Sequence, residues 1–166
     1  LREAIDALRQ AVALLPGFTT AREALGALLG VAGHPNDRVE QLEALAALDP
    51  DTSQRDVDLA LAYAGVGRTD MAVLSLGRAS EEHPEEAQVY AALGRVWLDI
   101  ARTADDRIAL TKAIRALQSI PQATASSEAL TLLARALLLA GEREEAVVLL
   151  ELATGRYPLD PSAFLE

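Results

Sequence analysis

The residues best suited to chemistry are few and far apart in this chain. There are two histidines, His34 and His83, and each directly precedes a proline. Histidine-based zinc sites place their ligands four residues apart on a helix or close together on a loop, which this pair does not do. The lack of cysteine excludes disulfides, thiolate chemistry and cysteine-based zinc sites. We therefore interpret both histidines as turn residues and expect no metal and no cofactor.

Pairs of adjacent glutamates are the next candidates, for acid–base catalysis or for calcium. They are Glu81-Glu82, Glu85-Glu86 and Glu144-Glu145. Neighbouring residues on a helix do not face one another, so such carboxylates do not converge on one substrate or ion. A solvated helix face explains them better. A glycine-rich phosphate loop and a Gly-x-Ser-x-Gly elbow are also missing, so we predict that the chain is not an enzyme.

The composition predicts an all-α fold. Of the 166 residues, 33 are alanine and 29 leucine, whereas aromatic residues make up only 4%. Alanine and leucine favour helix, and few β-branched or aromatic residues remain for a sheet. The net charge of −10 would repel a phosphate backbone, so we expect no nucleic-acid partner. No apolar run approaches the roughly 18 residues that a membrane span needs.

The spacing of the prolines reveals an internal repeat. Consecutive members of the series are 34, 34, 37 and 37 residues apart: Pro16, Pro50, Pro84, Pro121 and Pro158. Small and apolar residues keep the same frame five, eight and twelve positions earlier, as Ala79, Leu76 and Ala72 do before Pro84. These offsets place one small, apolar stripe on a single face of a helix.

A second helix is predicted upstream of each of these helices. Its pattern is leucine, then glycine or alanine, then a large apolar residue three positions on, as in Leu93-Gly94 with Trp97. Gly33, Gly67 and Gly141 follow in three of the units, where a helix end favours a residue that tolerates a left-handed conformation. Ala101 takes this place in the third unit. Each unit therefore consists of a helix, a tight turn, a helix and a proline.

This pattern resembles the tetratricopeptide repeat (TPR), a 34-residue helical hairpin that stacks into an α-α superhelix, or solenoid. The excess of arginine over lysine, 14 to 1, points to a bacterial protein. The resemblance to the TPR covers the whole chain and implies one TPR array. It divides the chain into a lone second helix, four complete units of which the third has insertions, and the start of a further helix: 1–18, 19–52, 53–86, 87–126, 127–160 and 161–166. Because the chain starts and stops inside units, we expect it to be a piece of a longer protein.

Several residues depart from the repeat pattern. Arg22 and Asp56 stand where the first helix should carry a large apolar residue, and Arg38 replaces a small residue of a second helix. Extra residues within 101–108 and 122–127 are expected to lengthen surface turns. Helix caps are predicted at Thr20, Asp37 and Thr103, each followed three residues later by an acidic side chain.

The resemblance also implies a binding surface, because the concave groove of a TPR array is built from the first helix of each unit. Transferring the groove positions to this sequence gives a mostly small and apolar lining that suits a helical or extended apolar peptide. The predicted partner-binding residues are Ala24, Ala27, Val57, Asp58, Leu61, Gln88, Ala91, Arg95, Asp99, Thr131, Arg135 and Leu138. One branch of the family holds a carboxylate terminus with lysine, asparagine and arginine at set groove positions. Those positions carry Glu23, Ala27, Asp58, Gln88 and Ala92 here, so this carboxylate clamp is not expected.

Two of these residues, Arg95 and Arg135, occupy the same position in successive units. They could together engage an acidic residue of a partner. Alternatively, Arg95 pairs with Asp99 on its own helix, and Arg135 reaches Glu128 or solvent. Tyr63 and Trp97 are expected to pack between helices rather than to form a binding platform.

The sequence thus predicts a non-catalytic scaffold for a protein or peptide partner, with a role in bacterial envelope, secretion or assembly systems as one setting. Two alternatives remain. The array could be an accessory part of an enzyme, such as a transferase or peptidase, within a longer protein. It could also self-associate into a homo-oligomer through the open repeats at its ends. The absence of cysteine is compatible with either the cytoplasm or the periplasm.

Overall fold

The computed structural model describes residues 1–48 and 52–156. These residues form nine helices and no strand, which confirms the all-α prediction. The chain divides into two compact units, Leu1–Ser75 and Leu76–Glu166. The predicted features at Pro50, Pro158 and 161–166 lie outside the described residues. Within the described part, no helix is both long and apolar enough to cross a membrane.

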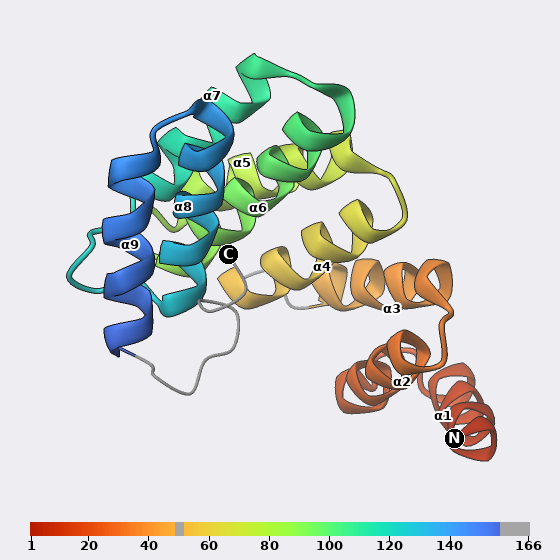
Figure 1. Cartoon of the computed structure of the whole chain (residues 1–166). Helices are drawn as coiled ribbons and strands as arrows, with labels where there is room; N and C mark the ends of the chain where they lie inside the picture. Colours follow the sequence, from red (N-terminus) through yellow and green to blue (C-terminus); the bar gives the residue numbers. More distant parts are fainter. Residues whose placement is uncertain (49–51, 157–166) are drawn as a thin grey trace. The chain divides into compact units, whose positions relative to one another are not determined.

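The first unit consists of consecutive helices, the first four of which pack on their neighbours in sequence (Figure 1). They are α1 (Arg2–Leu14), α2 (Thr19–Val31), α3 (Pro35–Leu48), α4 (Ser53–Gly65) and the start of α5 (Thr69–Glu82). One core cluster joins Ile5 of α1 to Leu25 and Leu29 of α2. These leucines lie four residues apart, so a single face of α2 is buried.

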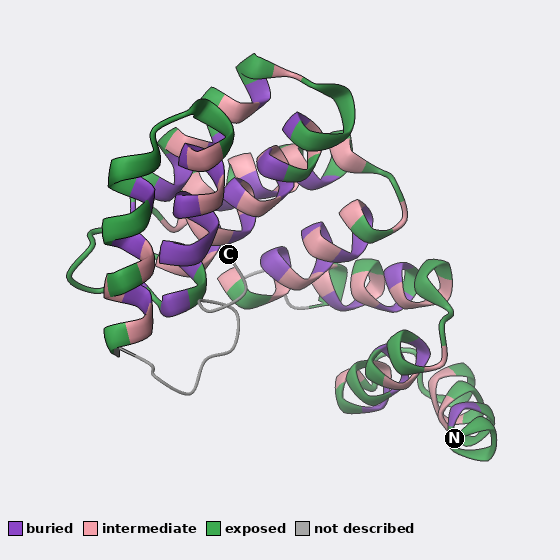
Figure 2. Cartoon of the chain, in the orientation of Figure 1, coloured by how far each residue is buried: buried purple, intermediate pink, exposed green. Residues whose placement is uncertain are grey.

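The second unit holds the rest of α5 and four more helices: α6 (Ala87–Ala104), α7 (Arg107–Gln118), α8 (Ser127–Ala140) and α9 (Arg143–Arg156). Helix α8 contacts α6, α7 and α9. It is accordingly buried over most of its length (Figure 2). This explains why the run 132–139 is apolar on nearly all sides, as a helix covered on several faces must be.

Small residues stand where two helices approach closely. A Cβ built on Gly94 of α6 would lie within 3.0 Å of three atoms of the Leu117 side chain on α7. The equivalent positions in the other three repeats hold Gly26, Ala60 and Ala134, all of which are buried. At Gly94 any larger side chain would overlap Leu117 of the second helix, whereas a Cβ on Gly26 would stand 3.7 Å from Gln41, an ordinary contact distance.

The predicted helix stops are confirmed at three glycines. Gly33, Gly67 and Gly141 have φ angles of 76°, 79° and 92°, a region that side chains with a Cβ rarely adopt. In the third repeat, residues 87–126, helix α6 continues to Ala104, and the left-handed residue is Asp105 at φ 51°. The prediction that the extra residues of 101–108 lengthen a turn was therefore wrong. Without a glycine at position 101, they add a further turn to the helix.

The three predicted helix caps were also wrong. Helix α2 has no side-chain cap bond at its start, although Thr20 lies in its first turn, and Asp37 lies inside the first turn of α3. Thr103 lies within α6, where its hydroxyl donates to the Asp99 carbonyl at 2.8 Å. The side chain that caps α7 is Asp106, which accepts from the amides of Ile108 and Ala109 at 2.7 and 3.2 Å. For α7 the sequence spacing placed the cap three residues too early, at Thr103, and for α2 it placed the cap two residues too late, at Thr20 rather than Phe18.

The arginines that depart from the repeat pattern have polar or close-packed neighbours. Arg22 donates to the Pro16 carbonyl at 2.7 Å and to Gln41 at 2.9 Å. The Arg38 side chain comes within 3.3 Å of the place where a Cβ would stand on Gly30. A long side chain on α3 is thus accommodated by a residue without one on α2.

Candidate functional site

The glutamate pairs and the histidines lie at helix ends and in the turns between helices. All three glutamate pairs are exposed, although Glu85 and Glu86 lie between α5 and α6 rather than on a helix face. Glu144 and Glu145 lie in the first turn of α9, where negative charge is favourable to the helix dipole. His34 directly precedes α3, and its carbonyl accepts from the Arg38 amide at 3.1 Å. His83 directly follows α5, which agrees with a turn position.

The first helices of the second unit, α6 and α8, lie in contact. An ion pair between Arg95 of α6 and Glu128 of α8 connects them. This is neither of the two arrangements expected for Arg95, which were pairing with Asp99 or binding a partner. The arginine that was expected to share its role, Arg135, lies further along α8 and is half-buried. The two residues therefore differ in their surroundings despite their matching positions in the repeat.

A hollow of about 310 Å³ opens between the same two helices, beyond the ion pair. Its lining residues are Arg102 at the end of α6 and Arg135, Leu138 and Leu139 of α8. Leu139 has 54% of its surface exposed, and Leu138 is half-buried. None of the four lining residues is acidic. The hollow thus offers two guanidinium groups beside two leucine side chains.

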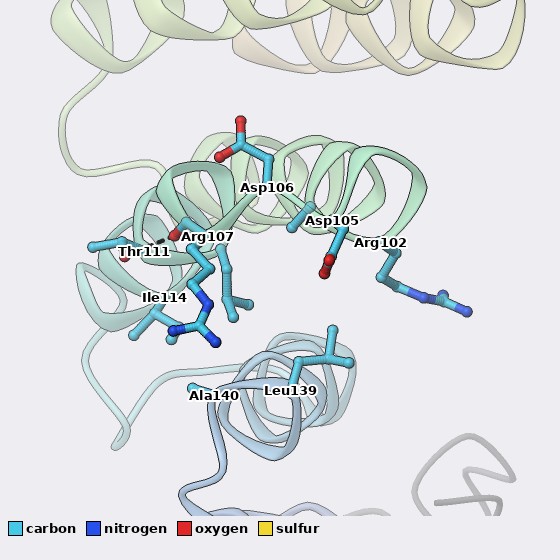
Figure 3. Close-up of a pocket in the computed structure, with 10 residues that line it drawn as sticks. Arg102, Asp105, Asp106, Arg107, Thr111, Ile114, Leu139 and Ala140 are labelled. Atoms are coloured by element: carbon cyan, nitrogen blue, oxygen red, sulfur yellow. Dashed lines mark hydrogen bonds between the residues drawn. The ribbon is translucent and has the colours of Figure 1, made fainter.

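A larger hollow of about 550 Å³ adjoins the first and shares Arg102 and Leu139 with it. It lies where α6 ends, α7 begins and α8 ends (Figure 3). Arg107 extends its guanidinium toward Ala140 and Leu139 in this view. Leu110 and Ile114 of α7 add apolar surface. Two carboxylates also line it, those of Asp105 and of the capping residue Asp106.

In the first unit, the corresponding helices are α2 and α4. Arg55 of α4 pairs with Glu23 of α2 at 3.0 Å, so here too an ion pair joins two first helices. Ala24 and Ala27 are exposed on α2. On α4, Leu61 is half-buried, and Asp58 accepts a hydrogen bond from Gln54 at 2.9 Å.

Two of the predicted partner-binding residues are buried and do not present side chains to a ligand. Val57 is 6% exposed and Thr131 is 2% exposed. The Thr131 hydroxyl donates to the Ser127 carbonyl at 2.8 Å, inside α8. These two assignments are corrected, because both side chains point into the packing of their helices. The other predicted residues of the second unit are exposed or half-buried: Gln88, Ala91, Arg95, Asp99, Arg135 and Leu138.

The aromatic residues contribute to packing. Tyr63 is 6% exposed, and its hydroxyl donates to Glu43 at 2.9 Å. Burial, together with the hydrogen bond and the charge of Glu43, raises the pKa of Tyr63, and Arg68 opposes this shift in part. Trp97 packs against the core of the second unit, with the Lys112 ammonium 4.2 Å from the ring centroid.

Sequence reasoning missed Arg102 as a binding candidate. It lies after the position where the other first helices end, in residues that were assigned to a surface turn. The missing glycine at position 101 was the signal that α6 continues through this segment.

Comparison with known proteins identifies the architecture. A tetratricopeptide repeat protein of Thermus thermophilus, TTC0263, superposes with a TM-score of 0.75 at 20% identity, over 97% of this chain and 85% of that one. The chain has the tetratricopeptide-repeat fold. YrrB, described as a TPR protein with an unusual peptide-binding site, has a TM-score of 0.68 at 16% identity, with 99% and 81% covered. PilW, described as a type IV pilus biogenesis factor, has a TM-score of 0.72 at 16% identity, with 96% and 72% covered. No family model and no curated protein sequence matches the chain.

Proposed function

We propose that this chain is a non-catalytic interaction scaffold whose first helices form a concave groove that binds a helical or extended apolar peptide segment. The observation that carries the proposal is the open hollow between α6 and α8, with Leu139 more than half exposed at its edge. Exposed apolar side chains beside polar anchors are typical of peptide-binding grooves. In the first unit, the exposed Ala24 and Ala27 would let a peptide backbone approach α2 closely.

The structural neighbours support this proposal in part. The description of YrrB as having a peptide-binding site shows that the same fold can hold a peptide. The description of PilW as a pilus biogenesis factor suggests envelope assembly as the setting, and we propose the same class of setting here.

The proposal can be tested with peptides selected from a random twelve-residue display library on the wild-type chain. Leu139→Glu should weaken binding of the selected peptides by about tenfold or more, because it places a charge in the apolar lining. Val148→Glu is the matched control, since Val148 is also exposed, at 61%, but lies on the second helix α9. Equal effects of both variants on affinity, or no selectable peptide at all, would argue against a first-helix groove.

Self-association is a second candidate, favoured by apolar residues around the turn between α1 and α2. Leu14, Leu15 and Phe18 are 84%, 60% and 43% exposed. Neighbouring exposed apolar residues of this kind favour contact with another protein surface. Sedimentation velocity over a concentration series tests this candidate. A larger species that disappears in Leu14→Glu would support it, and a monomer at every concentration would exclude it.

A further inference from the structure

We propose that the solvent-exposed face of α7, which carries Arg107, Ile108, Lys112 and Arg115, is a docking surface for an acidic segment of a partner protein. This inference goes beyond the proposed function, because α7 is a second helix and this face is separate from the groove of the first helices. A partner bound there would leave the groove open.

The packing of α7 determines which of its residues face solvent. Ala113 and Leu117 are among its buried residues, and the helix contacts α6 and α8. The exposed residues from the helix start to Arg115 are Arg107, Ile108, Thr111, Lys112 and Arg115. At about 100° per residue, they fall within an arc of about 140°. The basic side chains therefore share one side of a helix that is held in place by its opposite side.

Helix α7 differs from the other helices in charge. It holds three basic residues and no acidic residue, whereas each of the other helices in the described part of the chain contains at least one aspartate or glutamate. The whole chain carries a net charge of −10, so this basic face is a local exception. At physiological ionic strength, exposed charges act over about 8 Å. A ligand on this face would thus interact mainly with the three basic side chains.

The protein's own carboxylates do not neutralise these side chains. Within residues 1–48 and 52–156, the salt bridges use arginines of other helices or turns, namely Arg9, Arg55, Arg68, Arg78 and Arg95. The carboxylate just before α7, Asp106, accepts hydrogen bonds from two backbone amides. Lys112 lies over the Trp97 ring, a contact that positions the ammonium without cancelling its charge.

The chemistry of this face favours an acidic protein segment over an extended polyanion. Arginine pairs with carboxylates in two parallel hydrogen bonds. Ile108, which is 70% exposed among the basic residues, adds an apolar contact that an inorganic anion cannot use. Nucleic acid and an anionic bilayer present charge over a much wider surface than α7, so they would also meet the repulsion of the net charge of −10.

The experiment uses isothermal titration calorimetry at low salt with two capped helical peptides of fifteen residues. One peptide carries three glutamates, four residues apart, with a leucine beside them, and the other carries glutamines in their place. Arg107 and Arg115 lie about 12 Å apart along the helix axis, so the outer glutamates have a matching spacing. The glutamate peptide should bind about tenfold or more tightly than the glutamine peptide, and its affinity should fall as salt is raised.

The variants are Arg107→Glu and Arg115→Glu, with Arg143→Glu as the matched control. Arg143 is an exposed arginine of α9, so all three variants change the net charge of the chain equally. The first two should each lower affinity for the glutamate peptide by about tenfold or more, and the control should leave it nearly unchanged. Arg107→Gln and Arg115→Gln, which remove the charge without reversing it, should also weaken binding. Circular dichroism melting verifies the fold of each variant.

Three results would overturn the inference: no detectable binding of the glutamate peptide, equal affinity for the two peptides, or equal losses in Arg115→Glu and Arg143→Glu. Vesicles containing phosphatidylglycerol are a further probe. If they bind and the glutamate peptide does not, the face contacts lipid and the inference is also wrong. The groove is tested separately, because display-selected peptides should bind Arg115→Glu as tightly as the wild type. Failure of those peptides alone would contradict the proposed function and leave the α7 surface standing.

Discussion

At the residue scale, close packing explains the glycine and alanine column of the first helices. Gly94→Ala should lower the free energy of unfolding by up to about 2 kcal/mol, because overpacking against Leu117 costs roughly 1–3 kcal/mol and alanine's helix propensity returns only about 1. Urea denaturation measures the change. Gly77→Ala in α5 is the control, since a Cβ there meets no atom within 4 Å. It should raise stability by roughly 0.5–1 kcal/mol. A stabilising Gly94→Ala would mean that the two helices are less closely packed.

The Tyr63 hydroxyl makes the stability of the fold depend on pH in the alkaline range. Its pKa is raised in the folded state by burial and by Glu43, so the folded chain holds the phenol proton more tightly than the unfolded chain does. The resulting stabilisation is fully present below the unfolded pKa of about 10 and is lost as the pH rises through the folded pKa.

Tyr63→Phe should remove this part of the pH dependence. At pH 8 the variant should be less stable by about 1 kcal/mol, because the hydrogen bond to Glu43 is gone. As the pH rises from about 9.5 to about 11, a range that includes the unfolded pKa of about 10, the free energy of unfolding should fall more for the wild type than for the variant. Parallel denaturation curves at both ends of this range, with the same loss in both proteins, would show that Tyr63 does not titrate differently on folding.

At the element scale, the positions of the helix caps could not be predicted from the sequence spacing. The spacing of an acceptor and an acid also occurs by chance inside a helix, so it did not locate the caps. Asp106→Ala should destabilise α7 and lower the free energy of unfolding by about 0.5–2 kcal/mol, since two backbone amides lose their acceptor. Thr20→Ala should change it by less than about 0.5 kcal/mol, because α2 has no side-chain cap bond. Thermal melting distinguishes the two. A comparable loss of unfolding free energy in both variants would mean that Thr20 caps α2, as the sequence spacing predicts.

The helical hairpins themselves were predictable from the sequence because their determinants are local. The leucine and alanine periodicity and the glycines at helix ends act within one hairpin, so residues such as Gly33 and Gly141 could be interpreted directly. The end of α6 could not, because two structures fit the same extra residues. A longer loop would leave residues 101–104 outside a helix, whereas in the structure they are helical and Asp105 is the left-handed residue.

At the scale of the whole molecule, the repeat period predicts the fold, and the contacts between successive repeats, such as the ion pair between Arg95 and Glu128, determine the site. Arg95 and Arg135 are equivalent in sequence, yet the partner of Arg95 is set by a neighbouring first helix 33 residues further on in the chain. The ion pair between Arg95 and Glu128 cannot be predicted from the sequence pattern of either repeat alone. The same reason explains why Val57 and Thr131 were placed in the groove although they are buried.

The most direct test of the scaffold proposal is amide chemical-shift mapping of the chain by nuclear magnetic resonance, with a display-selected peptide as ligand. The largest shifts should fall on the exposed and half-buried residues of α6 and α8, including Leu138 and Leu139. The faces of α7 and α9 that point away from these helices should change little. Largest shifts on α7 and α9, or none anywhere at saturating peptide, would contradict binding by the first helices.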